Sequence, residues 1–201
     1  FYNHPGYIEP MRECVQEALA RIPADRRATT QIVFTAHSIP NAMAAGCDYE
    51  KQLKESCRLV SEAFPNQSWR LVYQSRSGAP SQPWLEPDVC DYLKDAHQSG
   101  DVTDVVVSPI GFISDHLEVL FDLDTEAQEL CTTLGLNMIR AATVGTHPRF
   151  IKMIRELICE RTNGAERVCL GTLGPNADVC PDDCCLSGRP TSSPRGAGRP
   201  H

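Results

Sequence analysis

The chain has few aromatic residues, no excess of positive charge and no long apolar run. Aromatic residues make up 6% of its 201 positions, and 26 acidic residues outnumber 19 basic ones, for a formal net charge of −7. Proteins that bind nucleic acids need Lys and Arg to neutralise phosphates, so this balance argues against a nucleic-acid partner. No stretch approaches the roughly 18 uninterrupted apolar residues of a membrane-spanning helix. We therefore expect a soluble globular protein without a transmembrane segment.

Two familiar sequence signals are also missing. No predicted strand is followed by G-x-G-x-x-G or by G-x-x-x-x-G-K-[ST], which removes the usual reason to expect a bound nucleotide. The first five residues contain no initiating Met, no basic segment and no apolar segment, so they do not form a secretory signal. We expect the chain to start within a longer protein.

Cysteine, in contrast, is plentiful, with ten residues. Six cysteines stand alone, and a chain of this length can bury a core without disulfides, so we interpret them as small buried residues of a reducing compartment, the cytoplasm. These six are Cys14, Cys47, Cys57, Cys90, Cys131 and Cys159. The remaining four are Cys169, Cys180, Cys184 and Cys185. They gather soft ligands that suit an Fe–S cluster or zinc, but a reactive or incidental group of thiols fits the spacing equally well.

Hydrophobic periodicity predicts helices that alternate with strands. Four apolar runs are typical of buried strands, at residues 32–36, 69–74, 102–108 and 137–143. Five helices are predicted at residues 8–21, 49–63, 87–97, 115–134 and 148–161. This order indicates the doubly wound α/β class, in which helices cover both faces of a parallel sheet. The pattern decays after residue 162, and residues 186–201 are too polar to bury a core and are predicted to be disordered.

Polar side chains follow two of the predicted strands, where ligands bind in sheets of this class. His37 comes directly after the first strand, although a ring that only satisfies loop carbonyls is equally compatible with this position. The second strand is followed by Ser75, Arg76 and Trp84, which suit a flat apolar ligand with anionic edges. The alternative is that this Trp is a local packing anchor, which is the commoner role of a Trp in a Pro-rich loop.

Acidic residues recur every four positions after the third strand, at Glu118, Asp122 and Glu126. On one α-helix they would form a stripe of like charges, which is mildly unfavourable unless a cation uses it. A solvated helix face is the commoner explanation of such a stripe. Glu118 also fits a capping box that begins at Asp115, which needs no catalytic role.

Three motifs in this region resemble the signatures of the ferrochelatase family, in that family's order. They are Thr35-Ala36-His37-Ser38-Ile39-Pro40; Tyr73-Gln74-Ser75 with Pro83-Trp84-Leu85; and Ser108-Pro109-Ile110-Gly111-Phe112 through Ser114-Asp115-His116-Leu117-Glu118 to Asp122-Leu123-Asp124. The resemblance covers residues 1–162 and implies the C-terminal α/β domain of a normally two-domain enzyme, chelatase-like and Rossmann-like without the dinucleotide motif. Residues 163–185 would then be a Cys-rich segment and 186–201 a tail. The family's N-terminal half, which supplies the opposite face of the active site, is absent from this sequence, so we interpret the chain as a fragment.

The resemblance implies a lyase of haem biosynthesis that inserts Fe²⁺ into a porphyrin. His37 and Glu118 would face each other across the metal-insertion site, with His37 as metal ligand or as base for the pyrrole protons. Asp122 and Glu126 would pass the hydrated cation inward, and His116 would contact the ligands rather than the metal.

The porphyrin would be bordered by Trp84, Ser75 and Arg76. The tail resembles that of actinobacterial members, which implies coproporphyrin III as substrate, with protoporphyrin IX as the alternative. Some members of the family carry a [2Fe–2S] cluster on three C-terminal cysteines and one further Cys. The candidate ligands here are Cys180, Cys184 and Cys185, with Cys169 in reserve.

Two other functions stay open. A cobalt or nickel chelatase would share the fold and the metal-site His, and its metal preference in an insertion assay would separate it from a ferrochelatase. A non-enzymatic iron or Fe–S carrier would need only the cysteine cluster and would not quench porphyrin fluorescence. The sequence does not indicate an oligomeric state.

Overall fold

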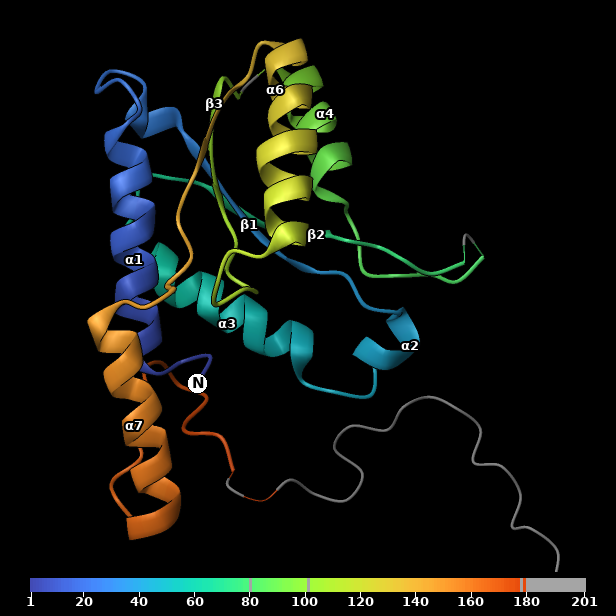
Figure 1. Cartoon of the computed structure of the whole chain (residues 1–201). Coiled ribbons are helices and arrows are strands. Elements are labelled where there is room, and N and C mark those ends of the chain that lie inside the picture. The colour runs from blue at the N-terminus through green and yellow to red at the C-terminus, as the bar shows by residue number, and fades with distance from the viewer. Residues whose placement is uncertain (80, 101, 178, 180–201) are drawn as a thin grey trace, which may run out of the picture.

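A computed structural model describes residues 1–79, 81–100, 102–177 and 179 (Figure 1). Its centre is a four-stranded parallel sheet with strand order β2-β1-β3-β4. The strands are β1 (Gln31–His37), β2 (Trp69–Gln74), β3 (Asp104–Ser108) and β4 (Asn137–Arg140). The predicted doubly wound parallel α/β sheet is confirmed.

Helices cover both faces of this sheet, and Figure 1 shows α1 and α6 on opposite sides of it. One face packs against α1 (Pro5–Ala20) and α3 (Tyr49–Ser61), and the other against α4 (Val89–Ser99) and α6 (Gln128–Leu134). The chain also forms η1 (Arg27–Thr29), α2 (Asn41–Ala44), α5 (Leu117–Val119), η2 (Leu120–Ala127) and α7 (Pro148–Asn163), which packs along α1.

Strand β1 supplies side chains to both cores because successive residues of a strand point to opposite faces. Ile32, Phe34 and Ala36 belong to the cluster under α1 and α3, and Val33 belongs to the cluster under α4 and α6. All four side chains are fully buried. A strand buried on both faces has no polar alternation, which is why its sequence is a continuous apolar run.

Capping residues explain where two helices begin. His4 is the N-cap of α1, and its Nδ1 accepts a hydrogen bond from the backbone N–H of Gly6 at 2.9 Å. The helix therefore starts three residues before the predicted Ile8. Asp88 is the N-cap of α4 and accepts from the backbone N–H of Cys90 at 2.8 Å.

The largest departure from the predicted secondary structure lies at residues 115–134. A single α-helix was expected, but the segment divides into α5, the π-helix η2 and α6. The N-cap is His116, whose Nδ1 accepts from the backbone N–H of Val119 at 3.1 Å, so the expected capping box on Asp115 is wrong. A π-helix bonds each N–H to the carbonyl five residues earlier, so the four-residue spacing of acids does not make one straight stripe.

The segment after α7 contains no helix or strand within its described residues. It runs beside the N-terminus, where the backbone N–H of Leu170 donates to the Asn3 carbonyl at 2.8 Å and the Asn3 side chain donates to the Gly174 carbonyl at 2.8 Å. The expected cluster ligands Cys180, Cys184 and Cys185 and the tail 186–201 lie outside the described residues. No helix in the described part of the chain is both long and apolar enough to span a bilayer.

Candidate metal site

The strand order makes the carboxyl ends of β1 and β3 a special place in the sheet. The chain passes from β1 to β2 on one side and then crosses to β3 on the other, which makes this the topological switch point where α/β sheets bind ligands. His37 is the last residue of β1, and the loop that leaves β3 leads to His116 and Glu118. His37 therefore meets His116 and Glu118, which lie far from it in the sequence, at one edge of the sheet.

The His37 ring presents a lone pair to Glu118. Its Nδ1 lies 2.5 Å from the Ser38 carbonyl oxygen, and because a carbonyl only accepts, Nδ1 carries the hydrogen. In the neutral ring Nε2 is then unprotonated, and it lies 3.5 Å from Oε1 of Glu118. Tyr49 steadies the end of the strand by donating its hydroxyl hydrogen to the His37 carbonyl at 2.9 Å. Burial raises the pKa of Tyr49 to about 12, so this donor keeps its proton at neutral pH.

His116 also faces the Glu118 carboxylate with its Nε2. Its Nδ1 accepts from Val119, so its Nε2 carries the hydrogen in the neutral ring, and this atom lies 4.0 Å from Oε2 of Glu118. The ring stands edge-on to Phe112 with a centroid distance of 5.3 Å. The Glu118 carboxylate therefore lies between the two imidazole rings, one near each of its oxygens.

The gap between His37 and Glu118 suits a small cation. Two donor atoms that bind one metal at about 2.1 Å and at a right angle are about 3.0 Å apart. The observed 3.5 Å is slightly wider, so one metal can contact both atoms at a somewhat larger angle. The side chains of His37 and Glu118 are 36% and 44% exposed, which leaves the gap open to solvent.

The other predicted metal ligands are not gathered at this gap. Asp122 is bound to the end of β2, since its Oδ2 accepts from Nε2 of Gln74 at 3.1 Å and from the hydroxyl of Ser75. Glu126 lies on the exposed side of η2. Within the described residues, no group of three or more His, Cys, Asp and Glu side chains is placed to hold a metal.

The predicted porphyrin-binding residues lie at the end of β2. The loop with Trp84 pairs with the loop after β1, where the backbone N–H of Leu85 donates to the Ile39 carbonyl at 2.9 Å. The indole rests on Gly78, where an added Cβ would lie 2.4 Å from the indole Nε1. Arg76 is exposed and donates to the Gln82 carbonyl at 3.0 Å. The backbone at Trp84 is thus paired with the loop that follows His37, and the indole packs on Gly78.

The sequence analysis missed three residues that support this site: Tyr49, Gln74 and Arg140. Arg140 forms ion pairs with Asp115 and Asp124, on either side of Glu118. Gln74 and Arg140 could have been found from the sequence, because each is a polar or charged residue in a predicted buried strand. A polar group that is buried there needs a hydrogen-bond or ion-pair partner. No comparable signal marks Tyr49.

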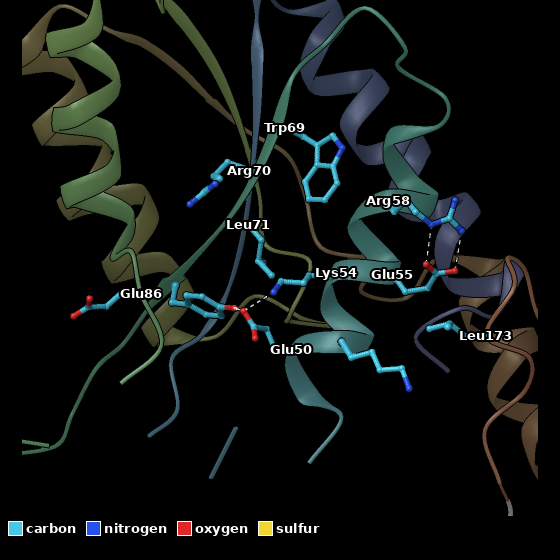
Figure 2. A pocket seen from close by; sticks show the side chains of 11 residues that line it. Glu50, Lys54, Glu55, Arg58, Trp69, Arg70, Leu71, Glu86 and Leu173 are labelled. Atoms are coloured by element: carbon cyan, nitrogen blue, oxygen red, sulfur yellow. Dashed lines mark hydrogen bonds and ion pairs between the residues drawn. The ribbon is translucent and has the colours of Figure 1, made fainter. Parts of the chain in front are cut away.

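A sizeable cavity lies away from this gap. It measures about 770 Å³ and is bounded by α3 and the edge strand β2 (Figure 2). Trp69 and Leu71 line its apolar side, and four of its charged residues form two ion pairs, Lys54 with Glu50 at 2.8 Å and Arg58 with Glu55 at 2.8 Å. None of the predicted site residues lines this cavity. Its size alone therefore does not indicate the functional site.

Comparison with known proteins identifies the family of this chain. Residues 1–162 match the sequence model of the ferrochelatase family. The chain belongs to the ferrochelatase family. This confirms the resemblance that the motifs carried.

Several relatives of this ferrochelatase-family chain are longer than the chain itself. It is 54% identical over 200 residues to a ferrochelatase of Rhodopirellula baltica, a match that covers 99% of this chain and 56% of the relative. It is 43% identical over 221 residues to a coproporphyrin III ferrochelatase of Streptomyces griseus, covering 100% of this chain and 59% of the relative. The chain therefore spans little more than half the length of these relatives.

A solved structure supports the fold. A multi-domain protein of Deinococcus radiodurans, described as structurally similar to chelatases, superposes with a TM-score of 0.53 over 82% of this chain and 30% of its own length. The two sequences are 14% identical, so this likeness concerns the fold alone.

Proposed function

We propose that this chain carries the metal-insertion site of an enzyme that places Fe²⁺ in a porphyrin. The observation that supports it is the distance of 3.5 Å between Nε2 of His37 and Oε1 of Glu118, two groups that both bind cations when the ring is neutral. Two acceptor atoms held face to face repel each other unless a proton or a cation lies between them. Fe²⁺ accepts both imidazole nitrogen and carboxylate oxygen, so it fits this gap.

The same pair of residues suits the proton balance of the reaction. Each Fe²⁺ that enters replaces two pyrrole protons, so the products are the iron porphyrin and two protons. Nε2 of His37 accepts a pyrrole proton or binds the cation, one at a time, and Glu118 offers the second basic atom. Nε2 of His116 lies 4.0 Å from the far oxygen of Glu118, so a second imidazole stands beside the same carboxylate.

The surrounding residues take the roles that the resemblance implies. Asp122 and Glu126 provide carboxylates on η2 along which the hydrated cation approaches. Trp84 provides a flat apolar surface for the macrocycle, with Ser75 and Arg76 at its edge. In the structure Asp122 is bound to Gln74 and Ser75, so it releases these contacts when it binds a cation.

We propose coproporphyrin III as the porphyrin because the Streptomyces griseus relative carries that substrate in its name. Protoporphyrin IX is the alternative. Insertion rates measured on the two porphyrins under the same conditions distinguish them, and a faster rate on protoporphyrin IX would contradict the proposal.

The test of the function uses a chimera in which this chain replaces the matching region of the Rhodopirellula baltica ferrochelatase. His37→Ala and Glu118→Gln should each lower Fe²⁺ insertion by roughly 100-fold or more. Equilibrium binding of Co²⁺ to the chain separates the two roles of His37: His37→Ala weakens binding if the ring is a ligand and leaves it unchanged if the ring is only a base. An inactive parent chimera, or near-normal insertion by both variants, would contradict the proposed function. Porphyrin fluorescence that is not quenched by the chimera would instead support a non-enzymatic iron carrier.

A [2Fe–2S] cluster and a cytoplasmic location are separate proposals. The cluster rests on the spacing of Cys180, Cys184 and Cys185, which lie outside the described residues. The location rests on the seven described cysteines, all of which are free thiols, as expected in a reducing compartment. Iron and sulfide contents at background level in the anaerobically purified chimera, without visible absorption, would contradict the cluster.

A further inference from the structure

We propose that Arg140 is a positioning residue that sets the location of Glu118 relative to His37. The inference rests on the proposed function, because it assigns a role in the same metal site. Arg140 is the last residue of β4 and lies outside the three motifs that carry the family resemblance.

Arg140 holds two carboxylates at once. Its NH1 and NH2 donate to the two oxygens of Asp115 at 3.1 and 3.3 Å, and its Nε donates to Asp124 at 2.5 Å. NH1 also donates to the carbonyl of Ala141 at 3.3 Å. The guanidinium therefore uses all three of its nitrogens, and the sheet and both acids hold it in one orientation.

These contacts bracket the segment that carries Glu118. Asp115 stands three residues before Glu118 and Asp124 stands six residues after it. A further bond joins the same two regions, from the backbone N–H of Gly145 to the Ile113 carbonyl at 2.9 Å. In the described part of the chain, the Glu118 carboxylate itself has polar contacts only with His37 and His116. Its location is therefore set by what holds the backbone on either side.

The ion pairs of Arg140 matter more because the segment that they hold includes a π-helix. A π-helical segment can rearrange to an α-helix by changing its hydrogen-bond partners, which shifts the residues that precede it along the axis. Asp124 lies inside η2, so its bond to Arg140 ties the π-helix to β4 and favours one register. Loss of this bond frees Glu118 to move away from the lone pair of His37.

Only Arg provides this geometry at the end of β4. Its planar guanidinium directs a fork at one carboxylate and a third N–H at another, whereas Lys offers a single point charge. The Arg140 side chain is 18% exposed, so solvent screens its contacts less than those of a surface pair. Burial lowers its pKa, but hydrogen bonds and charges from Asp124 and Asp115 outweigh this and raise the pKa, so the residue stays charged.

The test compares Arg140→Lys with a matched control. Arg58→Lys removes a similar double contact, to Glu55 and Glu62, on the surface of α3 away from the site. Both variants keep the positive charge. In the chimera, Arg140→Lys should lower kcat for Fe²⁺ insertion by about tenfold or more, since small misplacements of reacting groups have effects of this size. The KM for porphyrin should stay within about twofold, because among the described residues the polar contacts of Arg140 are to Asp115, Asp124 and Ala141 and not to the Trp84 loop.

Two further measurements separate positioning from stability. Co²⁺ binding to the folded chain should weaken in Arg140→Lys and not in Arg58→Lys, at a temperature well below both melting temperatures. In an Asp115→Ala/Asp124→Ala background the Arg140→Lys substitution should have no additional effect on kcat, because both side-chain acceptors of Arg140 are already gone.

The outcomes distinguish this proposal from the proposed function. A folded Arg140→Lys variant with normal kcat and normal Co²⁺ affinity would overturn the positioning role of Arg140. The proposed function would still stand if His37→Ala and Glu118→Gln lose Fe²⁺ insertion. A loss of kcat that only matches the loss of folded protein, as in the control, would also overturn the positioning role. Retained Fe²⁺ insertion in the His37 and Glu118 variants would overturn the proposed function. The Co²⁺ binding measurement would still test the positioning role of Arg140.

Discussion

Ser75 donates its hydroxyl hydrogen to Asp122, and this bond joins the end of β2 to the π-helix that follows Glu118. Ser75 has a φ of 63°, in the left-handed region that residues other than glycine rarely adopt. The adjacent Gln74 donates its side-chain amide to the same carboxylate. Two donors on successive residues thus share one acceptor, which offsets the strained backbone at Ser75.

Substitutions at Ser75 should separate the bond from the backbone strain. Ser75→Ala loses the hydroxyl but keeps a Cβ in the left-handed conformation. Ser75→Gly loses both the hydroxyl and the Cβ, and so removes the backbone strain. We expect Ser75→Gly to be the more stable of the two by about 1 kcal/mol in urea denaturation of the chain. Equal stability would show that the positive φ costs nothing here.

His116 should have two separable roles, as helix cap and as partner of Glu118. Asn caps helices well, so His116→Asn should keep the stability of the chain while His116→Ala loses about 1 kcal/mol. Both variants remove the N–H that faces Glu118, and both should bind Co²⁺ about tenfold more weakly, as is typical when a residue behind a metal ligand is lost. Calorimetric titration and thermal unfolding check the two effects. The prediction is wrong if His116→Asn, the more stable variant, binds Co²⁺ normally and only His116→Ala binds it more weakly.

His4 should make the stability of the fold dependent on pH. Burial lowers its pKa below the usual 6.5, and this outweighs the opposite effect of the nearby Glu156 and Glu160. The unfolded chain then binds a proton at a higher pH than the folded chain, so the free energy of unfolding decreases as the pH falls below about 6.5. Protonation would also remove the acceptor that caps α1.

The matched variant for this effect is His4→Asn, which keeps an N-cap acceptor and does not titrate. Urea denaturation between pH 5 and 7 should show a smaller pH dependence for His4→Asn than for the parent chain. Parallel pH profiles would assign the dependence to other groups.

Gly78→Ala should disturb the proposed porphyrin surface without touching the metal site. The added Cβ would lie 2.4 to 2.6 Å from three atoms of the Trp84 indole, so the ring must move. We expect weaker porphyrin binding by fluorescence quenching, with unchanged Co²⁺ binding. Ser77→Ala, one residue away and exposed, is the control. Normal porphyrin affinity in Gly78→Ala would argue against Trp84 as part of the porphyrin surface.

Most of the fold could be predicted from local patterns. The continuous apolar runs predict the four strands, and the run 69–74 coincides with β2. The N-terminal extension of α1 was missed because a histidine cap is less typical than Ser, Thr, Asp or Asn. The π-helix was missed because its residues follow the apolar spacing of an ordinary helix, while its hydrogen bonds depend on contacts such as the one between Asp122 and Ser75.

The sequence by itself determined the α/β class, the order of the strands along the chain and the three motifs that identify the family. These follow from side-chain periodicity and residue identity, which are properties of neighbouring positions. Only the tertiary structure decided that the rings of His37 and His116 flank the same carboxylate, that Asp122 is bound to β2, and that the contacts of Arg140 lie on both sides of Glu118. The physical reason is that tautomers and ion pairs depend on distances between groups that lie far apart in the chain, and folding alone sets those distances.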